Sequence, residues 1–441
     1  MGQSNISATS YQFKKIELTN HAGITWDIGD LIQSVEIVES VYTSTLTYEF
    51  SIVDAADFFN LVKISGNEKI NFVLAKHNGE ELEIFEKECY VVDIPLYSRQ
   101  GNNTQIYKLS CVSKHGYLAS IVRVSKKVNG SVVSIIKNLI EGDLDTPVAN
   151  VSLTSAGNIK GIIPNMNINE AIDTLLERAY DELGYKFFVY ETLFDGIRIE
   201  SFKPMLERKV RGVYKKNALK TKEASNDIAG DPHAAAGFNE DKYNIIDLSS
   251  ELGFSKLAAQ NNGVYSSNTL EVDTSKKSYK NHLFKYNNKN IINTQSLYSS
   301  DIKFKNLELS EFGDTYFSII NKSSLLFDNE QNYNSTIAPM FGITNSIEEN
   351  IQAMVHSMTV PGNPELSSGS IVDILLPKPI DPALENLSAI DAEHNIDRFM
   401  SGKYLVINNV HSFEKGVYKS TVRIVRDSTD VSLNENVPSK T

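Results

Sequence analysis

Two stretches in which polar and apolar residues alternate constrain most strongly what this chain can fold into. In the first, Lys403–Asp427, the residues Tyr418, Val422 and Ile424 share one parity, and polar residues stand between them. A period of two with many β-branched residues is typical of a strand with one buried face. The pair Lys415-Gly416 interrupts this pattern and predicts the turn of a β-hairpin.

The second stretch, Cys89–Ser113, has the same build, with a polar turn near Gln100-Gly101 between two strand patterns. Each hairpin also follows an apolar strand that has a glycine shortly before it. These strands are residues 69–74, after Gly66, and residues 371–376, after Gly369. We therefore predict that the chain contains two copies of one β module, and that the two hairpins occupy equivalent places in them.

Length and charge bound the kind of protein. The chain has 441 residues, which is long for one hydrophobic core and suggests about two to four domains. Lys and Arg number 43 against 55 Asp and Glu, which gives a net charge of −12. Because phosphate contacts require Lys and Arg, this balance argues against a general nucleic-acid binder. It fits a surface along which DNA passes without binding.

The chain carries only two cysteines, Cys89 and Cys111, which rules out a disulfide scaffold and gives no zinc pattern. We expect buried, reduced thiols roughly opposite each other in the hairpin, with a disulfide as the alternative. The N-terminus lacks a secretory signal, and Ile6 stands where myristoylation requires Ser or Thr. No apolar run approaches the roughly 20 residues of a membrane span, so we expect a soluble protein made in a cytoplasm.

Changes of pattern along the chain predict how it is divided. Strand patterns dominate both ends, helical patterns appear between them, and polar segments without periodicity separate the parts. The predicted parts are a polar N-terminal arm (1–11), a first β-barrel (12–125), an α+β domain (126–205), a basic flexible segment (206–243), a second β-barrel made of 244–275 and 345–430, an insertion (276–344) and a polar tail (431–441).

Helix signals are few. Asp54, with Asp57 three residues later, resembles a capping box and predicts a short helix after it. The other expected helices are Ser131–Glu141, a helix that begins at the capping-box pair Asn167 and Glu170, and a stretch around Leu309–Ile320.

Residues that could carry chemistry are scattered. No nucleotide-binding loop, hydrolase elbow, metalloprotease pattern or thiol pair occurs in the sequence. His411 shares the parity of the apolar residues in its strand, which favours a packed, hydrogen-bonded histidine over a catalytic one. Trp26, the only tryptophan, is an anchor at a barrel rim or subunit contact, or an ordinary packing residue.

One acidic loop could in principle share a cation. Its potential ligands are Asp391, Glu393, His394 and Asp397. The loop lacks the glycine and the spacing of a calcium-binding loop, so we interpret it as a solvated loop. We assign no catalytic, cofactor-binding or metal-binding residue, and no cofactor.

Positive charge is concentrated in one segment. The residues concerned are Arg208, Lys209, Arg211, Lys215, Lys216, Lys220 and Lys222. We favour a solvated flexible loop for this segment. An electrostatic contact with an acidic neighbour or with DNA is the alternative.

The order of these segments resembles the central baseplate hub of contractile-tail phages, which is related to the N-terminal part of the VgrG spike of type VI secretion. Gly362-Asn363, followed by Leu366 and Gly369 before an apolar strand, looks most like the late signature of that family. The other matching segments are VEIVESVYTSTLTYEFSIVD, GNEKINF, YVVDIPLY, SIIKNLI, NINEAIDTLLERA, IDLSSELGF, VPGNPELSSGSIVDILLPKP and YLVINNVHSFEKGVYKSTVRIVRD. The resemblance covers roughly residues 12–205 and 345–430.

This resemblance implies an α+β, mainly β fold with two tube-protein-like antiparallel β-barrels and an inserted α+β domain. It implies a homotrimer in which two modules per chain make a pseudo-sixfold ring in the tail baseplate of a virion. The implied partners are a hexameric tail tube protein and a trimeric central spike protein, with baseplate wedge and tape measure proteins as further candidates. DNA would pass through the lumen without specific binding, and no membrane insertion is expected.

We therefore interpret the chain as a structural protein without enzymatic activity. A tail-associated cell-wall hydrolase and a carbohydrate-binding tail adhesin are the alternatives, distinguished by a deep pocket with convergent carboxylates or by exposed aromatic residues in a groove. Segments 206–243 and 377–401 look long for the family. Phage, bacteriocin and secretion-device origins all remain open.

Overall fold

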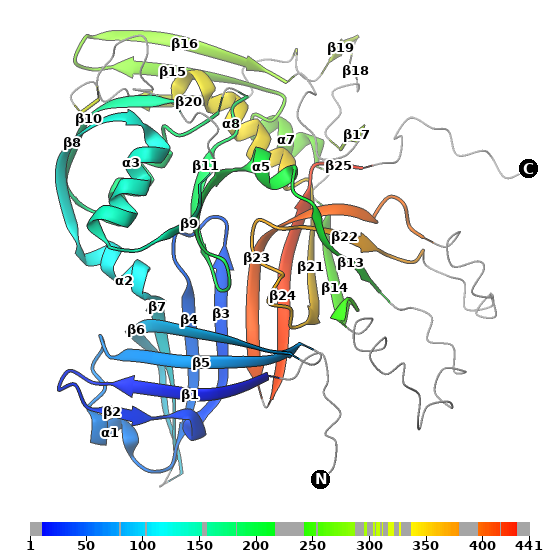
Figure 1. Cartoon of the computed structure of the whole chain (residues 1–441). Coiled ribbons are helices and arrows are strands. Elements are labelled where there is room, and N and C mark those ends of the chain that lie inside the picture. The colour runs from blue at the N-terminus through cyan, green and yellow to red at the C-terminus, as the bar shows by residue number, and fades with distance from the viewer. Residues whose placement is uncertain are drawn as a thin grey trace, which may run out of the picture.

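Strands dominate the computed structural model of this chain, as Figure 1 shows. The structure describes residues 11–78, 81–101, 104–151, 157–181, 183–216, 242–252, 255–286, 295–297, 303–304, 306–308, 311, 316–321, 326–327, 337–378, 396–414 and 416–429. Large antiparallel sheets accompanied by helices confirm the predicted α+β, mainly β fold class. Within the described ranges no helix is long and apolar enough to cross a membrane.

The first β module comprises the N-terminal strands, drawn in blue in Figure 1. In β4, Tyr48, Phe50 and Ile52 alternate with more exposed residues, and they pack with Phe72 and Leu109 in one core. The strands, in their order across the sheet, are β3 (Ile32–Ser40), β4 (Thr47–Asp54), β7 (Thr104–Ser113), β6 (Glu81–Gln100), β5 (Lys69–Asn78), β1 (Tyr11–Thr19) and β2 (Thr25–Asp27); the short helices η1 (Gly29–Leu31) and α1 (Phe58–Val62) connect them.

The second β module comes mainly from the C-terminal part of the chain. Met358, Val372, Tyr404 and Val422 belong to its core. The strands, in order, are β14 (Asp247–Leu252), β21 (Met354–Pro361), β24 (Val417–Arg426), β23 (Gly402–Glu414) and β22 (Ile371–Leu375), and β13 (Val210–Lys215) pairs with β22 in parallel.

The two modules repeat one strand order. The order β3-β4-β7-β6-β5 in the first matches β14-β21-β24-β23-β22 in the second, and all of these neighbours are antiparallel. The turns before β5 and β22 match as well: Asn67 and Gly369, both with positive φ, donate backbone hydrogen bonds to Val91 and Val406 respectively. The two hairpins therefore occupy the same place in the strand order.

The modules are joined through backbone pairing. Residues 408–414 of β23 pair antiparallel with residues 34–40 of β3, which makes one sheet of 13 strands. Figure 1 shows β3 and β4 standing beside the orange strands β23 and β24. The two tube-like modules are therefore two halves of a continuous sheet.

Helices and small sheets of residues 114–206 form the α+β part. The predicted capping box is confirmed, because Asn167 Oδ1 accepts from Glu170 N at 2.8 Å and Glu170 Oε2 accepts from Asn167 N at 3.2 Å. The helix predicted over Ser131–Glu141 is present as α3 and the π-helical turn that follows it. The elements are α2 (Lys114–Ile121), β8 (Arg123–Ser131), α3 (Val132–Asn138), η2 (Leu139–Asp143), β9 (Val148–Val151), β10 (Asn158–Asn167), α4 (Ile168–Leu176), β11 (Phe187–Thr192), β12 (Gly196–Ser201) and α5 (Phe202–Leu206).

A further layer, at the top of Figure 1, consists of α8 (Ala338–Ile351) against β15 (Ser266–Asp273) and β16 (Ser278–Lys285). The helix expected around Leu309–Ile320 is wrong where the structure can test it, because Phe317–Asn321 form strand β20. There the backbone of β20 pairs in parallel with β15, which overrides local helical preference. The remaining elements are α7 (Lys256–Asn261), β17 (Gln295–Ser296), β18 (Lys303–Phe304), β19 (Leu307–Glu308) and β25 (Ser428–Thr429).

The predicted flexible segment 206–243 contains ordered structure. Residues 210–215 form β13, since the edge of β22 supplies hydrogen-bond partners and Tyr214 is buried. Residues 217–241 lie outside the described residues, as do the arm before residue 11 and the tail after residue 429. The predicted boundary at 275 divides the hairpin β15–β16, and the one at 125 divides β8, because pairing rather than composition ends these strands.

Two local predictions hold in part. Asp54 accepts from the N–H groups of Ala56 and Phe59 and so caps α1, but Asp57 binds other side chains and completes no capping box. Cys89 and Cys111 are buried, free thiols. Gln100 pairs with Thr104, so the hairpin turns later than predicted; Cys89 lies opposite Ser113 and Cys111 opposite Val91.

The turn at Gly369 should tolerate no side chain. Its φ is +80°, and an added Cβ would meet the buried hydroxyl of Tyr190. Gly416 has the same φ but open space around its Cα, which makes it a matched control. We expect Gly416→Ala to lower the free energy of unfolding by about 1–2 kcal/mol through backbone strain alone. Gly369→Ala should cost roughly 1–3 kcal/mol more through overpacking, measured by urea denaturation. Equal losses would contradict the steric argument.

Candidate functional site

The junction between the two β modules surrounds a buried carboxylate, Glu39 of β3. Its Oε2 accepts from Leu193 N at 2.8 Å, and its Oε1 accepts from Ser368 N at 2.6 Å. Leu193 lies in the turn between β11 and β12, and Ser368 lies in the loop before β22. A carboxylate removed from water requires such donors. One side chain therefore connects the first module, the α+β part and the second module.

His411 of β23 lies next to this carboxylate and is fully buried. Its Nδ1 is 2.8 Å from the hydroxyl of Tyr418, and its Nε2 is 3.7 Å from Glu39 Oε2. The ring of Phe194 packs edge-on against the imidazole, with 5.6 Å between the ring centroids. These contacts agree with the predicted packed, hydrogen-bonded histidine.

A second polar contact joins the α+β part to the first module. Glu191 Oε2 accepts from Ser113 Oγ at 2.5 Å and from Leu46 N at 3.2 Å. Burial raises the pKa of the Glu191 carboxyl, and these two hydrogen bonds oppose that rise. Burial also lowers the pKa of the Lys87 ammonium, against the attraction of Glu191 and Glu39. Lys87 therefore attracts both buried carboxylates of the junction.

A third network includes a residue that the sequence analysis placed in the basic segment. Arg208 forms an ion pair with the buried Glu200 and donates to the carbonyl of Gly369 at 2.5 Å. Tyr190 donates to the other carboxylate oxygen of Glu200 at 2.6 Å. Glu200 neutralises the charge of Arg208, and the hydrogen bond to Gly369 connects the α+β part to the second module. Neither the flexible-loop nor the DNA-contact interpretation describes this residue.

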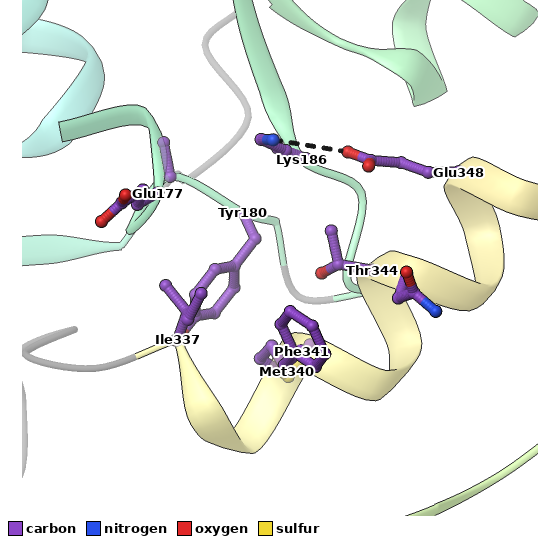
Figure 2. A pocket seen from close by; sticks show the side chains of 10 residues that line it. Glu177, Tyr180, Lys186, Ile337, Met340, Phe341, Thr344 and Glu348 are labelled. Carbon is purple, nitrogen blue, oxygen red and sulfur yellow. Dashed lines mark ion pairs between the residues drawn. The ribbon is translucent and has the colours of Figure 1, made fainter. Parts of the chain in front are cut away.

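Two cavities border the α+β part, and the larger, of about 240 Å³, is lined by residues 41–44 and 186–189 among others. The other, of about 120 Å³, lies between α8 and residues 177–186. Figure 2 shows Tyr180, Ile337, Met340 and Phe341 around it, while Lys186 Nζ lies 3.6 Å from Glu348 Oε1. Small-molecule pockets usually measure about 300–1,000 Å³. This cavity is a packing gap between helix and loop.

Trp26 and Asp397, also singled out from sequence, have structural roles. Trp26 packs edge-on against Phe58, with ring centroids 6.1 Å apart. Asp397 Oδ1 accepts from the backbone N–H groups of Phe399 and Met400. Asp391, Glu393 and His394 lie outside the described residues. Among the residues that are described, no group of acidic, histidine or cysteine side chains could hold a metal ion.

Sequence reasoning missed two open strand edges. Strand β14 ends the strand order, and residues 96–100 of β6 pair on one side only, with β7, in the described structure. Apolar side chains are exposed along both edges: Val92, Leu96 and Tyr97 on β6, and Ile246 and Leu252 at β14. An open edge presents unpaired N–H and C=O groups and favours pairing with another chain. The feature of this surface with a functional consequence is therefore its capacity to pair with a strand of another chain.

The comparisons with known proteins concern the fold. No protein-family model and no curated protein matches this sequence. The structure is similar to that of a tail protein from Neisseria meningitidis MC58, with a TM-score of 0.51 at 10% identity, over 95% of this chain and 97% of that one. It is also similar to a 43 kDa tail protein of prophage MuSo2 from Shewanella oneidensis, with a TM-score of 0.50 at 13% identity, over 94% and 98% of the two chains.

These similarities define the class of fold. The chain shares its fold with these two tail proteins over 94–95% of its length. The resemblance stated from sequence is confirmed to this extent: the fold is that of tail proteins.

Removing the charge of Glu39 should weaken the junction. In Glu39→Gln, one of the two backbone N–H groups faces an amide NH₂ instead of a carboxylate oxygen. We expect a loss of about 2 kcal/mol in the free energy of unfolding, measured by chemical denaturation. Glu36→Gln, an exposed position on the same strand, is the control and should change stability by less than about 0.5 kcal/mol. A similar loss in both variants would contradict the role assigned to Glu39.

Acid should destabilise the protein through His356. Burial, assisted by Arg426, lowers the pKa of this histidine to about 4, below its ordinary value of 6.5. The unfolded chain therefore binds more protons, and stability present above pH 6.5 is lost as the pH falls towards 4. His356→Gln should reduce this acid loss by about 2–3 kcal/mol at pH 4.5. Denaturation curves at pH 8 and 4.5 give the difference, and an unchanged acid loss would contradict the assignment.

Proposed function

We propose that this chain is a structural hub of a tail baseplate. Three copies form a ring of six quasi-equivalent β modules, which joins a hexameric tail tube to a trimeric central spike and leaves a channel for DNA. Its location is the tail of a virion, and its partners are the tube and spike proteins, with wedge and tape measure proteins as further candidates.

The repeated strand order carries this proposal. Two modules with the order β3-β4-β7-β6-β5 and β14-β21-β24-β23-β22 lie side by side in one sheet. Three copies of such a chain contain six similar modules, the number needed to match a sixfold tube. The assembly itself keeps threefold symmetry, which matches a trimeric spike. The fold similarity to tail proteins supports the same setting.

The charge balance supports a passage for DNA. The chain has a net charge of −12, so a ring made from it would release few counterions from passing phosphates. Arg208 and Arg198, which could bind phosphate, are engaged with Glu200 inside the protein. We therefore expect DNA to pass through the channel without binding to its wall.

The assembly can be measured directly. We expect native mass spectrometry of the full chain to give a species of three times 49.2 kDa. Electron microscopy of that species should show a ring with threefold symmetry and six similar lobes. A chain that stays monomeric at every concentration tested, with no ring in the images, would overturn the proposal.

A further inference from the structure

The junction inside the chain demonstrates how one module pairs with the next. Strand β3 of the first module pairs with residues 408–414 of β23 in the second. By strand order, β14 is the counterpart of β3, and β6 is the counterpart of β23. Both counterparts have an outer edge without a strand partner in the described structure, although β3 and β23 pair with each other through that edge.

We propose that β14 pairs antiparallel with residues 96–100 of β6 in a second copy of this chain, and that three such contacts close the ring. The proposal rests on the trimeric hub proposed above and specifies the contact that holds it together. Its partner is a second copy of this chain, since the seam between the modules already contains the same pairing.

Two landmarks align the modules. Val91 and Val406 are equivalent, because each exchanges backbone hydrogen bonds with the turn before β5 or β22 and is followed by a bulge. The cross-strand partners then correspond one by one: Val91, Cys111, Tyr48 and Ile37 in the first module, and Val406, Ile424, His356 and Ser250 in the second.

This alignment fixes the register of the proposed contact. Inside the chain, His411 is opposite Ile37, and Ser412 is opposite Glu36. The equivalent positions between copies place Tyr97 opposite Ser250, Ser98 opposite Ser249 and Leu96 opposite Glu251.

The single proline of β6 is compatible with this ladder. Pro95 cannot donate a backbone hydrogen bond, and it falls where the register of β6 against β7 shifts, between Asp93 and Leu96. From Leu96 to Gln100 the pairing with β7 is regular. The proposed contact uses this regular segment.

The seam inside the chain contains a buried carboxylate, Glu39, whereas the proposed seam between copies has an apolar residue at the equivalent position. At the seam inside the chain, Glu39 accepts from Ser368 N. In the equivalent turn of the first module, Glu68 itself accepts from Gly66 N at 2.9 Å and from Ser65 N at 2.8 Å. A second carboxylate is therefore unnecessary, and the position equivalent to Glu39 holds Leu252. Leu252 is 49% exposed in the single chain, so pairing would bury an apolar side chain.

A disulfide trap tests the register. In the full-length double variant Ser98→Cys/Ser249→Cys, directly opposite residues lie at a separation that a disulfide can span. In the control Ser98→Cys/Ser250→Cys, the side chains point to opposite faces of the sheet. The three positions chosen are exposed, and the native Cys89 and Cys111 are buried. Native mass is measured first, followed by mild oxidation and a non-reducing gel.

We expect the first variant to yield covalent trimer and linked dimer at least about tenfold above the control. A trimeric native mass without this cross-link, or with equal cross-linking of the control, would overturn the proposed pairing and leave the trimer intact. A monomeric native mass for the unmodified chain would overturn both the pairing and the hub. The two failures are therefore distinguishable.

Discussion

The carboxylate of Glu39 is fully buried, and it is stabilised because Leu193 and Ser368 bring backbone N–H groups to it from two other parts of the chain. The pairing of β3 with β23 places all three together. If either donor segment moved away, one carboxylate oxygen would remain buried in the seam without its backbone donor, which costs about 1–3 kcal/mol. The seam therefore fixes the relative position of both modules and the α+β part.

The other buried charges support the same arrangement. Glu191 binds the first module through Ser113, and Arg208 binds the second through the carbonyl of Gly369. Each contact joins segments that are distant in sequence, so the α+β part is bound to both modules and restrains their relative movement. A rigid pair of modules suits the ring proposed above, because six modules can close only if the angle within each pair is fixed.

Local patterns were sufficient for the elements that depend on neighbouring residues. The two hairpins follow from their period of two, and the capping box at Asn167 and Glu170 forms as the spacing predicts. Local reasoning failed where a distant partner decides the outcome. Phe317–Asn321 become a strand because β15 offers an edge, and residues 210–215 become a strand because β22 does.

The sequence by itself determined the class of fold, the two hairpins and the likeness of the two modules, since alternation and turn residues act over a few positions. Only the tertiary structure decided that Glu39 is a connecting residue, that Arg208 is an internal ion-pair partner, and that β6 and β14 keep open edges. The physical reason is range: the hydrogen bonds of Glu39 with Leu193 and Ser368, and of Arg208 with the carbonyl of Gly369, join residues more than a hundred positions apart, and a sequence pattern contains no register for them.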